Sequence, residues 1–132
     1  MNRRTTVIGA VLVLIGLPVV LVLIEAVSFY VLNRTNGTIV SSGQKREYLL
    51  YVPRSYDRTK PTPLVISMHA AALWPAAQME TSQWNKVADE HGFIAVYPSG
   101  TTLRGGGTGG RPRVWHVDRG AGLMRDVRFI SE

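Results

Sequence analysis

Cysteine is absent from this sequence of 132 residues. Without cysteine the chain can form no disulfide, thiolate nucleophile or cysteine-ligated zinc site, and no N-terminal cysteine can carry a lipid. The three histidines are scattered without the spacing of metal ligands, so we expect no metal and no cofactor. The net charge of +6 comes from basic residues spread along the chain without a clustered block, so a nucleic-acid partner is not expected either.

A long apolar run lies near the N-terminus. Two arginines precede Val7–Ile24, and after one glutamate the apolar character resumes to residue 32. In a helix, eighteen residues reach about 27 Å, close to the thickness of a hydrocarbon core. We expect residues 1–32 to be a signal anchor that contacts the membrane through residues 7–32, with the rest outside the cytoplasm. The alternative is a signal peptide cleaved near Ser28, which would release a secreted protein.

The remaining sequence predicts a polar linker at residues 33–43 and an α/β domain at residues 44–132. Gln44–Val52 becomes apolar on both faces, as in a strand covered on two sides. Leu64–Met68 follows two prolines and begins with a β-branched apolar run, which predicts a buried strand.

One helix is expected between this strand and the next. Four residues share one helical face: Trp84, Val87, Ala88 and His91. The helix is expected to start between Ala76 and Ser82, and Gly92 is placed to end it. Phe93–Tyr97 predicts a third strand, so the unit is βαβ with its two strands parallel.

The last part of the chain carries few structural signals. Residues 101–113 are rich in glycine and arginine, and Gly105-x-Gly107-x-x-Gly110 has the spacing of a dinucleotide fingerprint. No strand end precedes this spacing and no apolar helix face follows it, so a flexible loop is expected instead. Asp126 precedes two apolar residues at i and i+3, which predicts that it caps a helix.

The segment Pro63–Ala72, Pro-Leu-Val-Ile-Ser-Met-His-Ala-Ala-Ala, resembles the strand and His-Gly-Gly-Gly-type turn of α/β-hydrolase esterases. Arg46–Pro53, Trp84–Gly100 and Asp126–Ile130 complete, in family order, a resemblance to the polyhydroxybutyrate depolymerase/feruloyl esterase type. The resemblance covers only the N-terminal part of that family's domain. It implies an α/β-hydrolase with a mostly parallel sheet and flanking helices. It also implies an exported serine carboxylesterase that acts on small ester substrates.

The resemblance also implies roles for individual residues. In the family, the turn after the strand supplies a backbone N–H to the oxyanion hole, and here Ala71 is the first candidate and Ala70 the second. His69 is expected to support the turn by hydrogen bonding, because the catalytic base comes later in family order. Trp74 is a candidate for the substrate pocket. Ala70 stands where the family usually has glycine, so strain is expected there if φ is positive.

The Gly-x-Ser-x-Gly elbow that would carry the nucleophile is missing from these residues. In the family all three members of the triad follow the segment at Asp126, so they would lie past Glu132. We therefore expect a truncated esterase without activity of its own. The rival interpretation is a small membrane-anchored binding or interaction protein that reuses half a hydrolase sheet. A truncated esterase would leave Phe93–Tyr97 as an unpaired apolar edge, whereas a small complete protein would cover or charge that edge. No segment between Gly100 and Glu132 is clearly suited to cover it, so we favour the truncated esterase.

Overall fold

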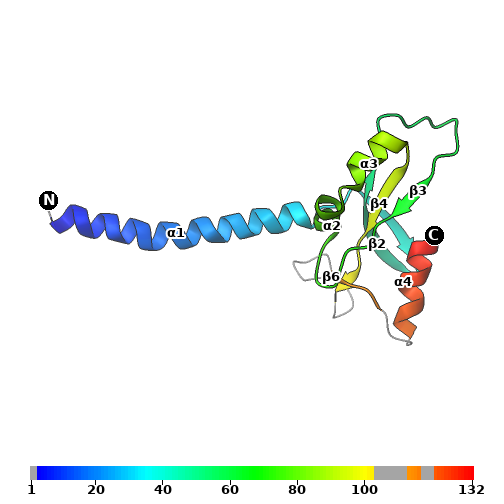
Figure 1. The fold of residues 1–132 in the computed structure, drawn as a ribbon. Helices are drawn as coiled ribbons and strands as arrows, with labels where there is room; N and C mark the ends of the chain where they lie inside the picture. The colour runs from blue at the N-terminus through cyan, green and yellow to red at the C-terminus, as the bar shows by residue number, and fades with distance from the viewer. Residues whose placement is uncertain (1–2, 103–112, 117–120) are drawn as a thin grey trace. The chain divides into compact units, whose positions relative to one another are not determined.

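The computed structural model describes residues 3–102, 113–116 and 121–132 (Figure 1). The glycine spacing at Gly105–Gly110 lies outside these residues. By its internal contacts the chain divides into two compact units, Met1–Val31 and Leu32–Glu132.

The first unit is an apolar helix. Helix α1 runs from Arg3–Leu32 and contains Pro18. Its Val13–Leu32 portion, with a mean hydropathy of 2.3, is long and apolar enough to cross a membrane. A signal peptide and a membrane anchor both fit such a helix, so the expected apolar helix is present and both interpretations stay open.

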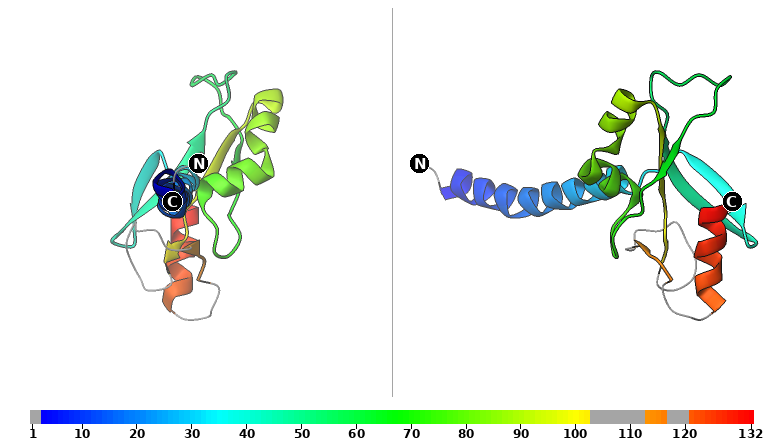
Figure 2. Two further views of the ribbon diagram at one scale, coloured as in Figure 1. Left: turned by 90° about the vertical axis from the view of Figure 1, so that its left-hand side faces the viewer. Right: turned by 45° about the vertical axis from the view of Figure 1, so that its right-hand side comes forward.

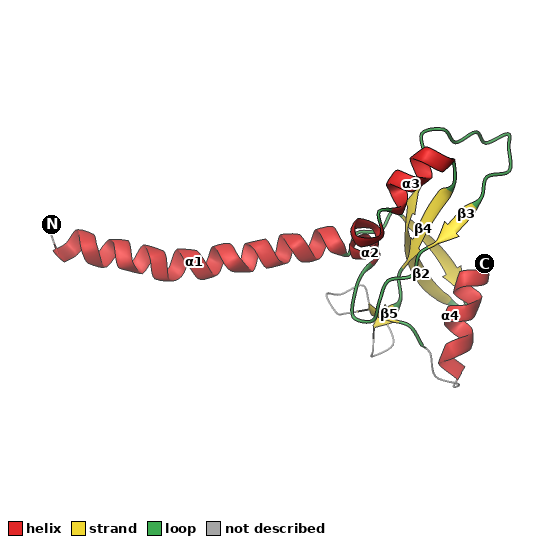
Figure 3. Cartoon of the chain, in the orientation of Figure 1, coloured by secondary structure: helices red, strands yellow, loops and turns green. Residues whose placement is uncertain are grey.

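The second unit is built on a four-stranded sheet in the order β1-β2-β4-β3 (Figure 3). The strands are β1 at Gly37–Ser41, β2 at Gln44–Tyr51, β3 at Leu64–Ile66 and β4 at Ile94–Pro98. The β1–β2 and β2–β4 pairs are antiparallel, and the β3–β4 pair is parallel. The sheet is therefore mixed, whereas a mostly parallel sheet was expected. Of its three strand pairs, only β3–β4 is parallel.

Strand β1 lies inside the segment that was expected to be a linker. Ser42 and Gly43, both with positive φ (50° and 73°), form a two-residue loop that returns the chain to β2. Such loops match the twist of paired antiparallel strands, which is why β1 and β2 cannot be parallel. The polar composition of residues 33–43 concealed the strand, because β1 lies at the edge of the sheet and two of its five residues are exposed.

Two helices, rather than one, connect β3 to β4. Helix α2 spans Pro75–Ser82 and α3 spans Trp84–His91. Gln83, with φ of 56°, separates them, and Gly92, with φ of 71°, ends α3 as predicted. The parallel βαβ connection predicted from the sequence is confirmed.

The edge of the sheet is not where the sequence placed it. Strand β4 pairs with β2 and β3, so the prediction of an unpaired edge at Phe93–Tyr97 is wrong. The two edge strands are β1 and β3, and in β3 Leu64 is 56% exposed and Ile66 is 40% exposed. The prediction that Leu64–Met68 is a buried inner strand is therefore also wrong among the described residues. An apolar run shows that a segment can be buried, but its neighbours are decided by the tertiary structure.

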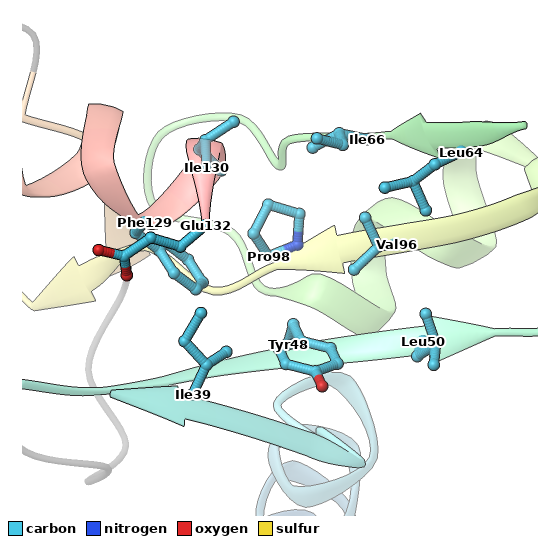
Figure 4. A pocket seen from close by; sticks show the side chains of 10 residues that line it. All are labelled: Ile39, Tyr48, Leu50, Leu64, Ile66, Val96, Pro98, Phe129, Ile130 and Glu132. Carbon is cyan, nitrogen blue, oxygen red and sulfur yellow. The ribbon is translucent and has the colours of Figure 1, made fainter. Parts of the chain in front are cut away.

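Helices α2 and α3 cover one face of the sheet, and α4, at Ala121–Ser131, lies on the other (Figure 2). The buried core of the first face consists of Leu49, Ala76, Ala95 and Tyr97. Successive side chains of a strand point to opposite faces of the sheet. The strand residues next to Leu49, Ala95 and Tyr97 in sequence therefore point to the opposite face, toward α4. They form an apolar groove of about 250 Å³ (Figure 4), lined by Ile39, Tyr48, Leu50, Leu64, Ile66, Val96, Pro98, Phe129, Ile130 and Glu132.

Asp126 lies inside α4, so the prediction that it caps the helix is wrong. The helix begins at Ala121, and Asp126 as a whole residue is 5% exposed. Its two oxygens accept hydrogen bonds from Arg46 Nη2 at 2.8 Å and from the backbone N–H of His116 at 2.7 Å. Asp126 therefore links α4 by hydrogen bonds to strand β2 and to the segment that contains His116.

A second, two-stranded sheet consists of β5 at Thr101–Thr102 and β6 at Arg113–Val114, in antiparallel alignment. The segment expected to be a flexible loop therefore begins and ends in paired strands. The isolated bridge between Leu73 and Arg113 brings β6 beside the turn that follows β3.

Candidate functional site

The turn at residues 67–74 connects β3 to α2 and contains the predicted oxyanion-hole residues. Three of its backbone N–H groups are already bonded: Ser67 donates to Val96 O at 2.9 Å, Ala72 to Arg113 O at 2.9 Å and Leu73 to Ala70 O at 3.1 Å. Ala70 and Ala71 are exposed, and neither N–H has an acceptor among the residues that the structure describes. The turn thus leaves two adjacent donors available to a ligand.

The alanine of this turn that has a positive φ is Ala72. Ala72, with φ of 63°, has the left-handed conformation, whereas Ala70 has no positive φ. The condition for strain at Ala70, a positive φ, is therefore not met. An L-residue in this conformation places its Cβ close to the following carbonyl oxygen, so the cost falls on Ala72. The hydrogen bond from Ala72 to Arg113 helps to hold it there.

His69 is buried, with 2% of its surface exposed, and both ring nitrogens are bonded. Nε2 lies 3.0 Å from the backbone N of Gly100, and Nδ1 lies 2.8 Å from Ala70 O. A backbone N–H can only donate, so Nε2 is the acceptor and Nδ1 carries the hydrogen of a neutral ring. Burial lowers the pKa of His69, and the hydrogen bond to Ala70 partly opposes that shift. The ring is thus engaged in hydrogen bonds to backbone on both sides of it.

Trp115 completes the surroundings of His69. The Trp115 indole donates to His69 O at 2.9 Å, and the two rings lie 5.0 Å apart. Trp74 is half-buried at the residue before α2 and does not line the apolar groove. A substrate-contacting role for Trp74 stays a prediction, as does the role of His69 in a functional turn.

Arg113 and Gly100 belong to this site, and the sequence analysis missed both. Arg113 is 6% exposed, and its Nη1 donates to Gly100 O at 3.3 Å while its Nη2 lies 3.5 Å from Glu47 Oε2. Burial lowers the pKa of Arg113, and the charge of Glu47 opposes that shift. No sequence signal identified Arg113, because its partners are distant in sequence and it ends a segment rich in glycine and arginine.

A second buried arginine lies beside the same backbone. Arg46 donates to Ser99 O at 3.4 Å and to Asp126 Oδ1 at 2.8 Å, and its guanidinium lies 4.1 Å from the centre of the Phe129 ring. The carboxylates of Asp126 and Glu47 thus accompany the two buried cations, as burial of charge requires. Within the described part of the chain, no group of three or more histidine, aspartate or glutamate side chains is placed to hold a metal ion.

The chain matches no protein-family model. Over 60 residues it is 33% identical to the bifunctional acetylxylan esterase/xylanase XynS20E of Neocallimastix patriciarum. The matched stretch is 46% of this chain and 9% of the length of that protein. The match supports a distant esterase-like relationship, and it does not single out the polyhydroxybutyrate depolymerase/feruloyl esterase type.

Proposed function

We propose that residues 67–74 form the oxyanion-binding turn of an exported serine hydrolase that resembles carbohydrate esterases. In this proposal the backbone N–H groups of Ala71 and Ala70 donate to the negative charge that develops on the carbonyl oxygen of an ester. The supporting observation is that these two donors have no acceptor in the part of the chain that the structure describes, whereas those of Ala72 and Leu73 are bonded. In α/β-hydrolases, one oxyanion-hole donor comes from the loop between the third strand and the helix that follows it. The turn at residues 67–74 lies between β3 and α2, which corresponds to that loop.

His69 is assigned to support of the turn and not to proton transfer. A general base needs a free nitrogen within reach of the proton that it removes. Here Nε2 accepts from Gly100 and Nδ1 donates to Ala70, so removal of a proton would require these bonds to break. The proposal is therefore limited to oxyanion binding. Hydrolysis also requires a nucleophile, and no Gly-x-Ser-x-Gly elbow is present in these residues.

The proposed substrate is a small carboxylic ester. The name of the fungal relative points to O-acetyl esters on a carbohydrate. The finer assignment, to the polyhydroxybutyrate depolymerase/feruloyl esterase type, rests on the ordered motifs between Arg46 and Ile130. It would bring aryl or short acyl groups beside Trp74. Helix α1 supports export, either as an anchor or as a cleaved signal.

The test is direct observation of the turn while an analogue of the tetrahedral intermediate binds. We would titrate the full-length, ¹⁵N-labelled chain in detergent micelles with methylphosphonate, which presents tetrahedral anionic oxygens. The amides of Ala70 and Ala71 should shift in a saturable manner at millimolar concentrations. The bonded amides of Ala72 and Leu73 serve as internal controls and should respond less. Equal responses at all four amides, or none, would contradict the proposal.

A further inference from the structure

The peptide of Gly100 is held from both sides. Its N–H donates to His69 Nε2 at 3.0 Å, and its C=O accepts from Arg113 Nη1 at 3.3 Å. A side chain at this position has no room, because a Cβ on Gly100 would lie 2.5 Å from Val114 O. Glycine at residue 100 therefore allows a tight approach between β5, β6 and the ring of His69.

These contacts reach the two sides of the proposed oxyanion-binding turn. On one side, Gly100 orients the His69 ring, whose Nδ1–H donates to Ala70 O at 2.8 Å. On the other side, the backbone C=O of Arg113 accepts from Ala72 N–H at 2.9 Å. The free N–H of Ala71 lies between these two attachments. Arg113 takes part in both of them, once through its backbone and once through its guanidinium.

The guanidinium of Arg113 is itself fixed to the sheet. Its Nη2 lies 3.5 Å from Glu47 Oε2 and 3.4 Å from Asn33 Oδ1. Glu47 belongs to β2, an inner strand, and its backbone C=O accepts from Ser99 N–H at 2.8 Å. A planar guanidinium can direct several N–H groups in fixed directions, which a lysine cannot do. Arg113 thus joins the turn, the Gly100 peptide and the sheet.

We propose that Arg113 is the positioning residue of the oxyanion-binding turn. It holds the Gly100 peptide with its guanidinium and the Ala72 N–H with its backbone, so that the N–H groups of Ala70 and Ala71 stay directed at one ligand oxygen. This inference rests on the proposed function of the turn. It adds a residue that touches no substrate and acts through Gly100 and His69.

The first measurement compares methylphosphonate binding in four forms of the full-length chain: the wild type, Arg113→Met, Arg113→Lys and the control Arg58→Met. Arg58 is exposed in the loop between β2 and β3, so its loss removes the same charge at a distance. In Arg113→Met, the affinity for methylphosphonate measured at the Ala70 and Ala71 amides should fall by about tenfold, which is the effect of losing one charged hydrogen bond. Arg113→Lys should fall between it and the wild type. Arg58→Met should stay within about twofold of the wild type.

The second measurement separates positioning from general stabilisation. In Arg113→Met the Gly100 amide should exchange with solvent at least about tenfold faster, and the His69 ring should lose its fixed Nδ1–H tautomer. The Ile94 amide, which donates to Pro63 O beside β3 and β4, should exchange at its wild-type rate. A merely structural role would accelerate both amides by the same factor.

The possible results are distinct. An unchanged affinity in Arg113→Met would overturn the inference and leave the proposed oxyanion site intact. A wild-type chain that shows no response at Ala70 and Ala71 would overturn the proposed function, and the role of Arg113 in binding with it. If Arg113→Met does not fold, Glu47→Gln keeps Arg113 in place and weakens its anchor. That variant should bind about threefold more weakly, and wild-type affinity would again overturn the inference.

Discussion

The ion pair between Arg46 and Asp126 provides the sharpest test of how this fold is held together. The two side chains are only 3% and 7% exposed, and Nη2 and Oδ1 lie 2.8 Å apart. Substitution of Asp126 by asparagine keeps an oxygen that can accept the His116 N–H, so it isolates the loss of charge. The amide NH₂ group then faces a guanidinium that can only donate. Removing one member of a buried pair leaves the other charge uncompensated, which costs about 3 to 5 kcal/mol.

The assay is urea unfolding of the full-length chain in mild detergent, followed by tryptophan fluorescence. All three tryptophans lie in the second unit, so the signal is independent of α1. With a urea slope of about 2 kcal/mol per M, a loss of about 4 kcal/mol lowers the unfolding midpoint by about 2 M. The matched control is Glu80→Gln, which removes the exposed ion pair to Arg34 and should cost less than about 1 kcal/mol.

The double variant Arg46→Met with Asp126→Leu replaces the whole ion pair by apolar side chains. It removes both charges, so it should regain about 2 kcal/mol relative to Asp126→Asn. It should remain below the wild type, because the His116 N–H loses its acceptor. A loss of less than about 1 kcal/mol in Asp126→Asn, or a double variant no more stable than the single one, would refute the reasoning.

Three further predictions concern the turn and its chemistry. Ala72→Gly should raise the free energy of unfolding by up to about 1 kcal/mol, because φ is 63° there, whereas Ala71→Gly should lower it; a loss in both variants would contradict the assignment of strain. Burial lowers the pKa of His69 in the folded state. Below a pH of about 6.5, the unfolded state therefore binds more protons than the folded state does. The contribution of His69 to the free energy of unfolding should therefore be constant above that pH and decrease below it, and His69→Gln should flatten this decrease. Finally, the full-length chain should show no saturable hydrolysis of p-nitrophenyl acetate above the imidazole background, since no nucleophile elbow is present; saturable turnover would disprove that expectation.

Local signals in the sequence predicted several elements correctly. The face shared by Trp84, Val87, Ala88 and His91 predicted α3, and Gly92 marked its end. The spacing of Leu64–Met68 and Phe93–Tyr97 around this helix predicted the parallel β3–β4 pair. These features depend on periodicity and on backbone preferences within a few residues, so they are visible in a sequence.

Other predictions failed because they depended on partners far away in the chain. Asp126 is of a residue type that often caps helices, yet its side chain is bonded to Arg46 on β2. The polar segment at residues 33–43 forms β1 because β2 is available to pair with it. No local pattern shows that a carboxylate will meet a buried arginine, or that a polar segment will complete the edge of a sheet.

The sequence by itself determined the apolar N-terminal helix, the βαβ order and the absence of cysteine chemistry and of a nucleophile elbow. These are properties of composition and of short-range spacing. Only the tertiary structure decided which strands lie at the edges of the sheet and which N–H groups of the turn have no acceptor among the described residues. It also decided that Gly100 donates to His69 and accepts from Arg113. Those properties arise because β4 pairs with both β2 and β3, and because the turn after β3 is hydrogen-bonded to β6. The residues involved become neighbours only when the chain folds.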